Sequence, residues 1–326
     1  MGIHNALGLS TQHTLGTSVY YVGIGLHSGA GVTLRVRPAP ADTGIQFLRK
    51  DAPPETGMIP ARWNRVADTR RCTVLMNEHG VSVRSVEHLL AALHACNIDN
   101  AIVEIEGPEV PAVDGSAQPF VTLIEQASVT RQETPRQALK ILKPVIVWDE
   151  DRFALLLPGD ERRITVEIDF ANAAIGFQRF SLEVGPEEFK RELARARTFG
   201  FLEQVNKLRR WGLARGGSLQ NAIVLKGEQV LNEEGLRFPD EFARHKALDC
   251  VGDLALAGAP LIGHLVTYKP SHALTNSLIR TVFAQADAWR YTGSDEFSEL
   301  RRWRQAAETS LVNVAERARN WWRYVA

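Results

Sequence analysis

Short predicted strands and single helices follow one another in this chain without a regular strand–helix–strand alternation. The segment 31–39, GVTLRVRPA, alternates the apolar Val32, Leu34 and Val36 with polar residues, which predicts a half-buried strand. The segment 100–107, NAIVEIEG, shows the same alternation. The chain contains no GxGxxG element of the kind that opens a dinucleotide-binding fold. This order of elements favours the α+β class over a doubly wound parallel sheet.

A polar segment with a proline, SVTRQETPRQ at 128–137, separates the first strands from a second set. The second set is predicted at 138–148, 152–158 and 163–170. The chain has 326 residues, which is enough for two domains that each bury a core. We therefore predict an N-terminal α+β domain at 1–130, a C-terminal α+β domain at 138–294 and a helical C-terminal extension at 295–326.

Composition excludes several classes of partner. The 38 basic and 38 acidic residues cancel, so no overall field favours nucleic acid. No segment reaches the roughly 20 apolar residues of a transmembrane helix. Three widely separated cysteines fit reduced thiols, which indicates a cytoplasmic protein. The extension places Trp321 and Trp322 among arginines, so we weigh a tail helix docked on the body of the protein or on a second subunit against a peripheral membrane contact.

The segment 85–96, SVEHLLAALHAC, predicts an amphipathic helix. Its apolar stripe consists of Val86, Leu89, Leu90 and Leu93. At 100° per residue His88 projects from the opposite side, with Glu87 on a flank. We predict that the stripe packs on a sheet and leaves His88 free for another role.

A second predicted helix contains RHKALDCVGD at 244–253, preceded by Asp240 as a candidate cap. His245, Asp249 and Asp253 are spaced four residues apart and therefore share one face. The opposite, buried side is predicted to consist of Ala247, Val251, Leu254 and Gly258.

This spacing leaves two interpretations open, a solvated polar face or half of a metal site. A catalytic zinc site usually has three protein ligands, and His88 is the best candidate for the third. Glu87 beside it could act as a base on a metal-activated water. His272, in the predicted loop KPSHALTN, could protonate the departing amine, although an unrelated surface histidine is the simpler interpretation of that residue alone.

Several long segments in one order identify a family. The segments are SVEHLLAAL, GPEVPAVDGSAQPF, RARTFGF, GGSLQNAIV, LNEEGLRFPDEFARHKALDCVGDL and SHALTN. Together they resemble the UDP-3-O-acyl-N-acetylglucosamine deacetylases, the zinc amidases of bacterial lipid A biosynthesis. The resemblance extends from Gly23 to about Arg280 and does not cover the extension well.

The resemblance implies roles for the residues at the matching positions. His88, His245 and Asp249 match the zinc ligands of the family, and Glu87 matches its general base. His272 matches the general acid, although Ser271 stands where the family motif has glycine.

Further positions match the surroundings of this centre. Asp253 matches the carboxylate that partners the acidic histidine, and such a partner favours the imidazolium. Thr198 matches a hydroxyl that stabilises the oxyanion, and Lys246 matches a lysine near developing charge or substrate phosphate.

The substrate cleft and acyl-chain passage of the family match Phe199, Phe201, Gly217 and Ser218. Without the resemblance, these phenylalanines would be core residues and Gly217 a turn residue. His27 lies in a matching GLHSG motif, but no role is assigned to it.

The family fold consists of two similar domains, each a mixed sheet with a helical layer, stacked as a β-α-α-β sandwich. The resemblance thus implies one Zn²⁺ per chain at the domain junction, although two histidines and an aspartate are also compatible with iron. The implied reaction is hydrolysis of the N-acetyl amide of a UDP-linked, 3-O-acylated glucosamine, with release of acetate. Two alternatives are an amidase for another acylated substrate and a non-catalytic nucleotide-sugar or lipid-binding regulator.

Overall fold

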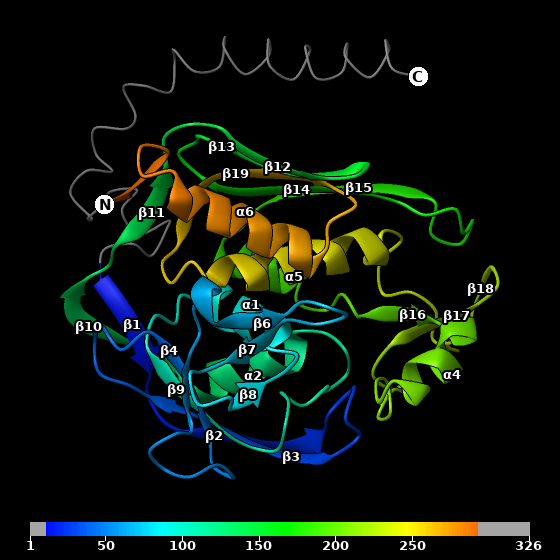
Figure 1. Ribbon diagram of the computed structural model, residues 1–326, viewed down its shortest axis with the longest axis horizontal. Coiled ribbons are helices and arrows are strands. Elements are labelled where there is room, and N and C mark those ends of the chain that lie inside the picture. Colours follow the sequence, from blue (N-terminus) through cyan, green and yellow to red (C-terminus); the bar gives the residue numbers. More distant parts are fainter. Residues whose placement is uncertain (1–10, 293–326) are drawn as a thin grey trace.

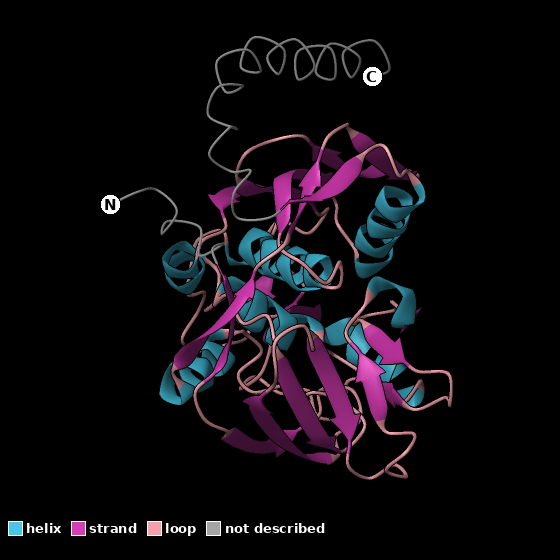
Figure 2. Cartoon of the chain, turned by 90° about the vertical axis from the view of Figure 1, so that its left-hand side faces the viewer, coloured by secondary structure: helices cyan, strands magenta, loops and turns pink. Residues whose placement is uncertain are grey.

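Two large sheets lie on opposite sides of a layer of helices (Figure 1). The computed structural model describes residues 11–292. One sheet lies at each face, and the helices α1, α2, α5 and α6 lie between them. The perpendicular view shows the same order of layers (Figure 2). The predicted α+β class is confirmed, whereas the boundaries of the two domains stay a prediction.

The N-terminal half forms a five-stranded sheet. Its strands are, in order, β2 (Val19–Ile24), β3 (Gly31–Pro38), β9 (Ala101–Glu106), β4 (Ile45–Arg49) and β5 (Met58–Pro60). Neighbours are antiparallel except for β4 and β9, which are parallel. The alternation predicted for β3 is confirmed, because Val32, Leu34 and Val36 are buried.

The C-terminal half forms a seven-stranded mixed sheet. Its main path is β12 (Val145–Asp149), β13 (Arg152–Leu157), β19 (Leu261–Tyr268), β11 (Ala138–Ile141) and β20 (Trp289–Thr292). β14 (Arg162–Asp169) pairs in parallel with β19 and also carries β15 (Phe177–Glu183). β11 pairs with the first residues of β19, and β14 pairs with the residues that follow. The two strands therefore lie one after the other along the same side of β19.

Smaller elements surround these layers. A three-stranded sheet of β16 (Phe199–Phe201), β17 (Ile223–Lys226) and β18 (Gln229–Val230) carries α4 (Leu202–Arg210). A second consists of β6 (Val66–Asp68), β7 (Val74–Met76) and β8 (Ser82–Val83), preceded by the 3₁₀ turn η2 (Trp63–Arg65). The short helix α3 (Pro186–Glu192) follows β15. None of the helices between Thr11 and Thr292 combines the length and apolar character that crossing a bilayer requires.

The inner helices are α1 (Glu87–Ala95), α2 (Gln118–Ala127), α5 (Glu241–Ala255) and α6 (His272–Ala284). α1 packs mainly against α5 and α2, so the prediction that its apolar stripe packs on a sheet is wrong. Every residue of α1 except His88 and His94 is buried. The polar row of α5 is also buried, because α1 and α6 cover it.

A glycine sets the distance between α1 and α5. A Cβ atom at Gly252 would collide with the backbone carbonyl of Glu87. The absence of a side chain at this one position allows the two backbones to approach closely. This contact places the first turn of α1 directly over the polar row of α5.

Three details differ from the predictions. The polar separator is mostly a strand, β10 (Val129–Pro135), which pairs with β1 (Thr11–Leu15). Asp240 holds the N-cap position of α5 but does not cap, because its carboxylate accepts a 2.6 Å bond from Arg244. His272 begins α6 and is not in a loop. The extension at 295–326 lies outside the described residues.

Candidate active site

A cavity of about 370 Å³, here called the active-site cavity, opens beside the first turns of α1 and α6. Both halves of the chain contribute to its wall, so residues far apart in the sequence face one another. The candidate residues that line it are His27, Glu87, His88, Thr198, Phe199, His245, Lys246, Asp249 and His272. Asp253 is buried behind His272.

Three candidate metal ligands converge at this cavity. One ligand atom from each of His88, His245 and Asp249 lies within 4.8 Å of the other two. The Nε2 atoms of both histidines are 3.4 Å from the same oxygen, Oδ1 of Asp249. Among residues 11–292 this is the one group of three such side chains that meets this criterion.

The surroundings of this group fit a metal ion. The backbone carbonyl of Ala196 lies 3.1 Å from Nδ1 of His245, which directs the Nε2 lone pair toward Asp249. Burial lowers the pKa of His245 to about 3, so the ring is neutral and able to coordinate. Lys246 Nζ donates to Oδ2 of Asp249 at 2.9 Å and leaves Oδ1 facing the histidines. Two imidazole nitrogens and one carboxylate oxygen are a donor set that suits Zn²⁺ or Fe²⁺.

A carboxylate and a histidine face each other beside the ligands. Glu87 Oε1 is 3.9 Å from His272 Nε2, and both side chains are buried. Burial raises the pKa of Glu87. Burial alone would lower the pKa of His272, but the adjacent Asp253 carboxylate raises it to about 10. His272 therefore carries a proton at neutral pH, while Glu87 is held next to that positive charge.

Behind this pair, Asp253 and Thr73 form a second layer of contacts. Asp253 Oδ2 is 2.8 Å from His272 Nδ1. Thr73 Oγ1 donates to the other oxygen of Asp253 at 2.6 Å, and Thr73 N donates to Glu87 Oε2 at 3.0 Å. Thr73 was not predicted from the sequence, because nothing distinguishes one threonine before a short strand from any other.

A sequence profile of the family described as "LpxC: UDP-3-O-acyl N-acetylglycosamine deacetylase" matches residues 12–284. The chain belongs to this family of deacetylases. A relative named UDP-3-O-acyl-N-acetylglucosamine deacetylase from Myxococcus xanthus is 50% identical over 278 residues, which cover 85% of this chain and 88% of the relative. Relatives with the same name from Phenylobacterium zucineum and Idiomarina loihiensis are 47% and 46% identical and cover 86% and 87% of this chain. The matched lengths are 95% and 94% of those two relatives.

The candidate substrate residues of this family member divide into two groups. Thr198 and Phe199 lie in the active-site cavity, where Lys246 Nζ is 5.7 Å from the centre of the Phe199 ring. Phe201 is partly buried, packs against Phe170 and does not line the cavity. The structure therefore brings only part of the predicted substrate-binding set to the metal-ligand group.

Gly217 and Ser218 lie in the loop that follows α4 and do not line the active-site cavity. The preceding glycine ties this loop to the GLHSG motif, because Gly216 N donates to the carbonyl of Leu26. Within that motif, His27 is buried in the cavity wall, and burial together with Arg84 lowers its pKa to about 4.

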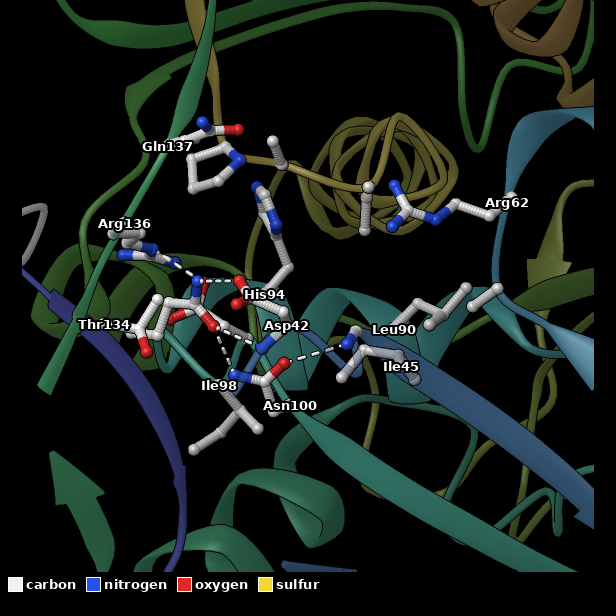
Figure 3. A pocket seen from close by; sticks show the side chains of 18 of the residues that line it. Asp42, Ile45, Arg62, Leu90, His94, Ile98, Asn100, Thr134, Arg136 and Gln137 are labelled. Carbon is white, nitrogen blue, oxygen red and sulfur yellow. Dashed lines mark hydrogen bonds and ion pairs between the residues drawn. The ribbon is translucent and has the colours of Figure 1, made fainter. Parts of the chain in front are cut away.

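A second cavity lies at the other end of α1. This cavity, here called the His94 cavity, measures about 500 Å³ and is larger than the first. Figure 3 shows His94, Arg62 and Arg136 among the side chains that line it. Asp99, also in its wall, forms a 2.7 Å ion pair with Arg136. Size alone would therefore have pointed to the wrong end of the helix for a metal centre.

Proposed function

We propose that this protein hydrolyses the N-acetyl amide of UDP-3-O-acyl-N-acetylglucosamine in lipid A biosynthesis, with one Zn²⁺ bound by His88, His245 and Asp249. One observation carries the proposal. The two histidines and the aspartate converge in one cavity beside the Glu87–His272 pair, in a chain that belongs to the deacetylase family. The relatives described above are all named for the deacetylation of this substrate.

The bound metal ion would supply two effects, a lowered pKa of a water molecule and polarisation of the amide carbonyl. Glu87 accepts the proton of the attacking water at Oε1, the oxygen on the side of His272, because Oε2 accepts a hydrogen bond from Thr73 N. The water oxygen forms a bond to the carbonyl carbon. The Thr198 hydroxyl then donates to the oxyanion that develops on the former carbonyl oxygen.

His272 completes the reaction as the general acid. Its Nε2 proton passes to the amine nitrogen as the carbon–nitrogen bond breaks, so acetate and a free glucosamine amine are released. Asp253 stabilises the imidazolium through Nδ1 and orients the ring. Lys246 lies beside Asp249 and the cavity wall, where its charge favours an anionic part of the substrate.

Phe199 and, farther along, Phe201, Gly217 and Ser218 are proposed to contact the sugar and acyl chain. The support is positional: Phe199 lines the cavity and begins the strand β16 that contains Phe201, and Gly216, next to Gly217, donates to the carbonyl of the cavity residue Leu26. We further propose that the reaction takes place in the cytoplasm, since the three cysteines are buried free thiols.

The experiment is a direct assay of the purified protein. Acetate release from the UDP-linked substrate is measured together with metal content, before and after removal of the metal by a chelator and its replacement with Zn²⁺ or Fe²⁺. We expect about one metal ion per chain and activity that returns with zinc. A matched substrate without the 3-O-acyl chain tests selectivity, and equal turnover of the two substrates would favour an amidase of broader range. Tight binding of the substrate without acetate release would contradict the proposal.

A further inference from the structure

Thr73 lies where the proposed base and the carboxylate behind the proposed acid meet. It precedes β7 and is only 1% exposed. Its backbone N–H donates to Glu87 Oε2 at 3.0 Å, and its hydroxyl donates to Asp253 Oδ1 at 2.6 Å. A single residue thus contacts two buried carboxylates that come from different halves of the chain.

The remaining oxygens of these carboxylates both face His272. Glu87 Oε1 is 3.9 Å from His272 Nε2, and Asp253 Oδ2 is 2.8 Å from His272 Nδ1. The contacts therefore form a closed ring from Thr73 through Glu87, His272 and Asp253 back to Thr73. Thr73 occupies one oxygen of each carboxylate and leaves the other for the histidine.

The hydroxyl has a specific electrostatic role in this ring. In the part of the chain that the structure describes, Thr73 and His272 are the two side-chain partners of the Asp253 carboxylate. A buried carboxylate that loses a donor is strongly destabilised or changes its orientation. In either case the oxygen that holds Nδ1 of His272 is no longer fixed.

We propose that Thr73 is a positioning residue for the deacetylation, acting through Asp253 on His272 and through its backbone on Glu87. The inference rests on the proposed function. Its hydroxyl holds the Asp253 carboxylate so that the imidazolium keeps the orientation needed for proton transfer to the amine. Thr73 itself does not contact the substrate, because it lies behind the two carboxylates and not in the cavity wall.

The test compares Thr73→Val, which removes the hydroxyl at nearly constant shape and keeps the backbone N–H, with Thr73→Ser, which keeps both donors. We expect Thr73→Val to lower kcat by roughly 10- to 100-fold and to change KM by less than about threefold. Loss of residues that orient the groups around a metal has effects of about this size at other metal sites. Thr73→Ser should restore most of kcat. Metal content should stay equal in both variants. Thr73→Ala removes the same hydroxyl with a smaller side chain and replaces the valine variant if that variant does not fold.

Thr14→Val is the matched control, because Thr14 is also buried and its hydroxyl also donates, at 2.6 Å to the carbonyl of Asn100, but on β1 away from the cavity. This variant should keep the wild-type kcat. An equal loss in Thr73→Val and Thr14→Val would overturn the inference.

A double-mutant cycle separates positioning from a general structural role. If the hydroxyl acts through Asp253, Thr73→Val should lower kcat by less than about threefold in an Asp253→Asn background. The same full loss in both backgrounds would contradict the inference. Wild-type kcat in Thr73→Val would also contradict it and leave the proposed function intact, whereas absence of acetate release by the wild-type enzyme would contradict the proposed function first.

Discussion

The two ends of α1 each project a histidine into a cavity, and the two cavities differ in charge arrangement more than in size. His88 lines the active-site cavity of about 370 Å³, and His94 lines the cavity of about 500 Å³. At the first end, two imidazole nitrogens lie 3.4 Å from one carboxylate oxygen. At the other end, the nearby carboxylate of Asp99 is already paired with Arg136.

The difference has a simple electrostatic cause. Burial, together with Arg162 and Arg136, lowers the pKa of His94 well below its usual value. A divalent cation next to His94 would meet the guanidinium groups of Arg136 and Arg162, and the Asp99 carboxylate there is already neutralised by Arg136. Convergence of three candidate ligand atoms within 4.8 Å, and not cavity volume, therefore distinguishes the candidate metal centre from the other cavity.

The largest expected effect comes from exchanging the two histidines of α1 for alanine, one at a time. His88→Ala removes a proposed ligand and should lower both metal content and deacetylation, the latter by more than about 100-fold, the upper range for partners that only orient a ligand. His94→Ala should retain about one metal ion per chain and most activity. Metal analysis and acetate release measure both variants. Equal loss of metal in the two variants would contradict the assignment of the metal site to the His88 end of α1.

The next effect separates chemistry from metal binding within the active-site cavity. Glu87→Gln and His272→Gln should each lower kcat by roughly 10²- to 10⁴-fold, the usual contribution of a general base or acid, while metal content stays unchanged. Full activity of either variant with metal present would remove that residue from the mechanism.

Asp253→Asn tests the charge that distinguishes His272 from His94. In the wild type, activity that requires the protonated His272 should fall as pH rises through about 10, the pKa of this group. Without the Asp253 charge, burial lowers that pKa, so the decline of kcat/KM should move to lower pH, toward the usual histidine value of about 6.5. The carboxylates of Glu87 and Asp249 also raise the pKa of His272, and both remain in the Asp253→Asn variant. A pH profile with an unchanged alkaline limb would contradict the assignment.

The smallest effect concerns the helix crossing that places the active-site end of α1 over α5. Gly252→Ala should lower the free energy of unfolding by about 1–3 kcal/mol, because the new methyl group meets the Glu87 backbone, which cannot yield as a side chain does. Gly31→Ala on β3 is the control, since open space surrounds that position, and its effect should stay within about 0.5 kcal/mol. Urea denaturation of both variants provides the measurement. Equal free energies of unfolding in the two variants would show that α1 and α5 can move apart to accommodate the methyl group without loss of stability.

Local periodicity predicted many of the elements. The strands β3 and β9 and the helix that contains His245 and Asp249 lie where alternation and helical spacing placed them. The prediction was wrong for the separator, because β10 gains its partner from β1, more than 100 residues earlier. It was also wrong for the environment of His272, where Ser271 caps a helix by accepting a hydrogen bond from Leu274 N. The first error arises from a long-range contact that a local pattern does not contain, whereas the second concerns a serine N-cap, which is a local signal.

The sequence by itself determined the family, through long motifs in one order, and the pairing of His245 with Asp249, because residues four apart on a helix are neighbours in any fold. Only the tertiary structure decided that His88 reaches this pair, since α1 and α5 are far apart in the chain and meet through packing at Gly252. It also decided that the polar row of α5 is buried and that Thr73 joins the two carboxylates. The physical reason is that helical periodicity acts over a few residues, whereas burial and contacts between the two halves depend on how the layers pack.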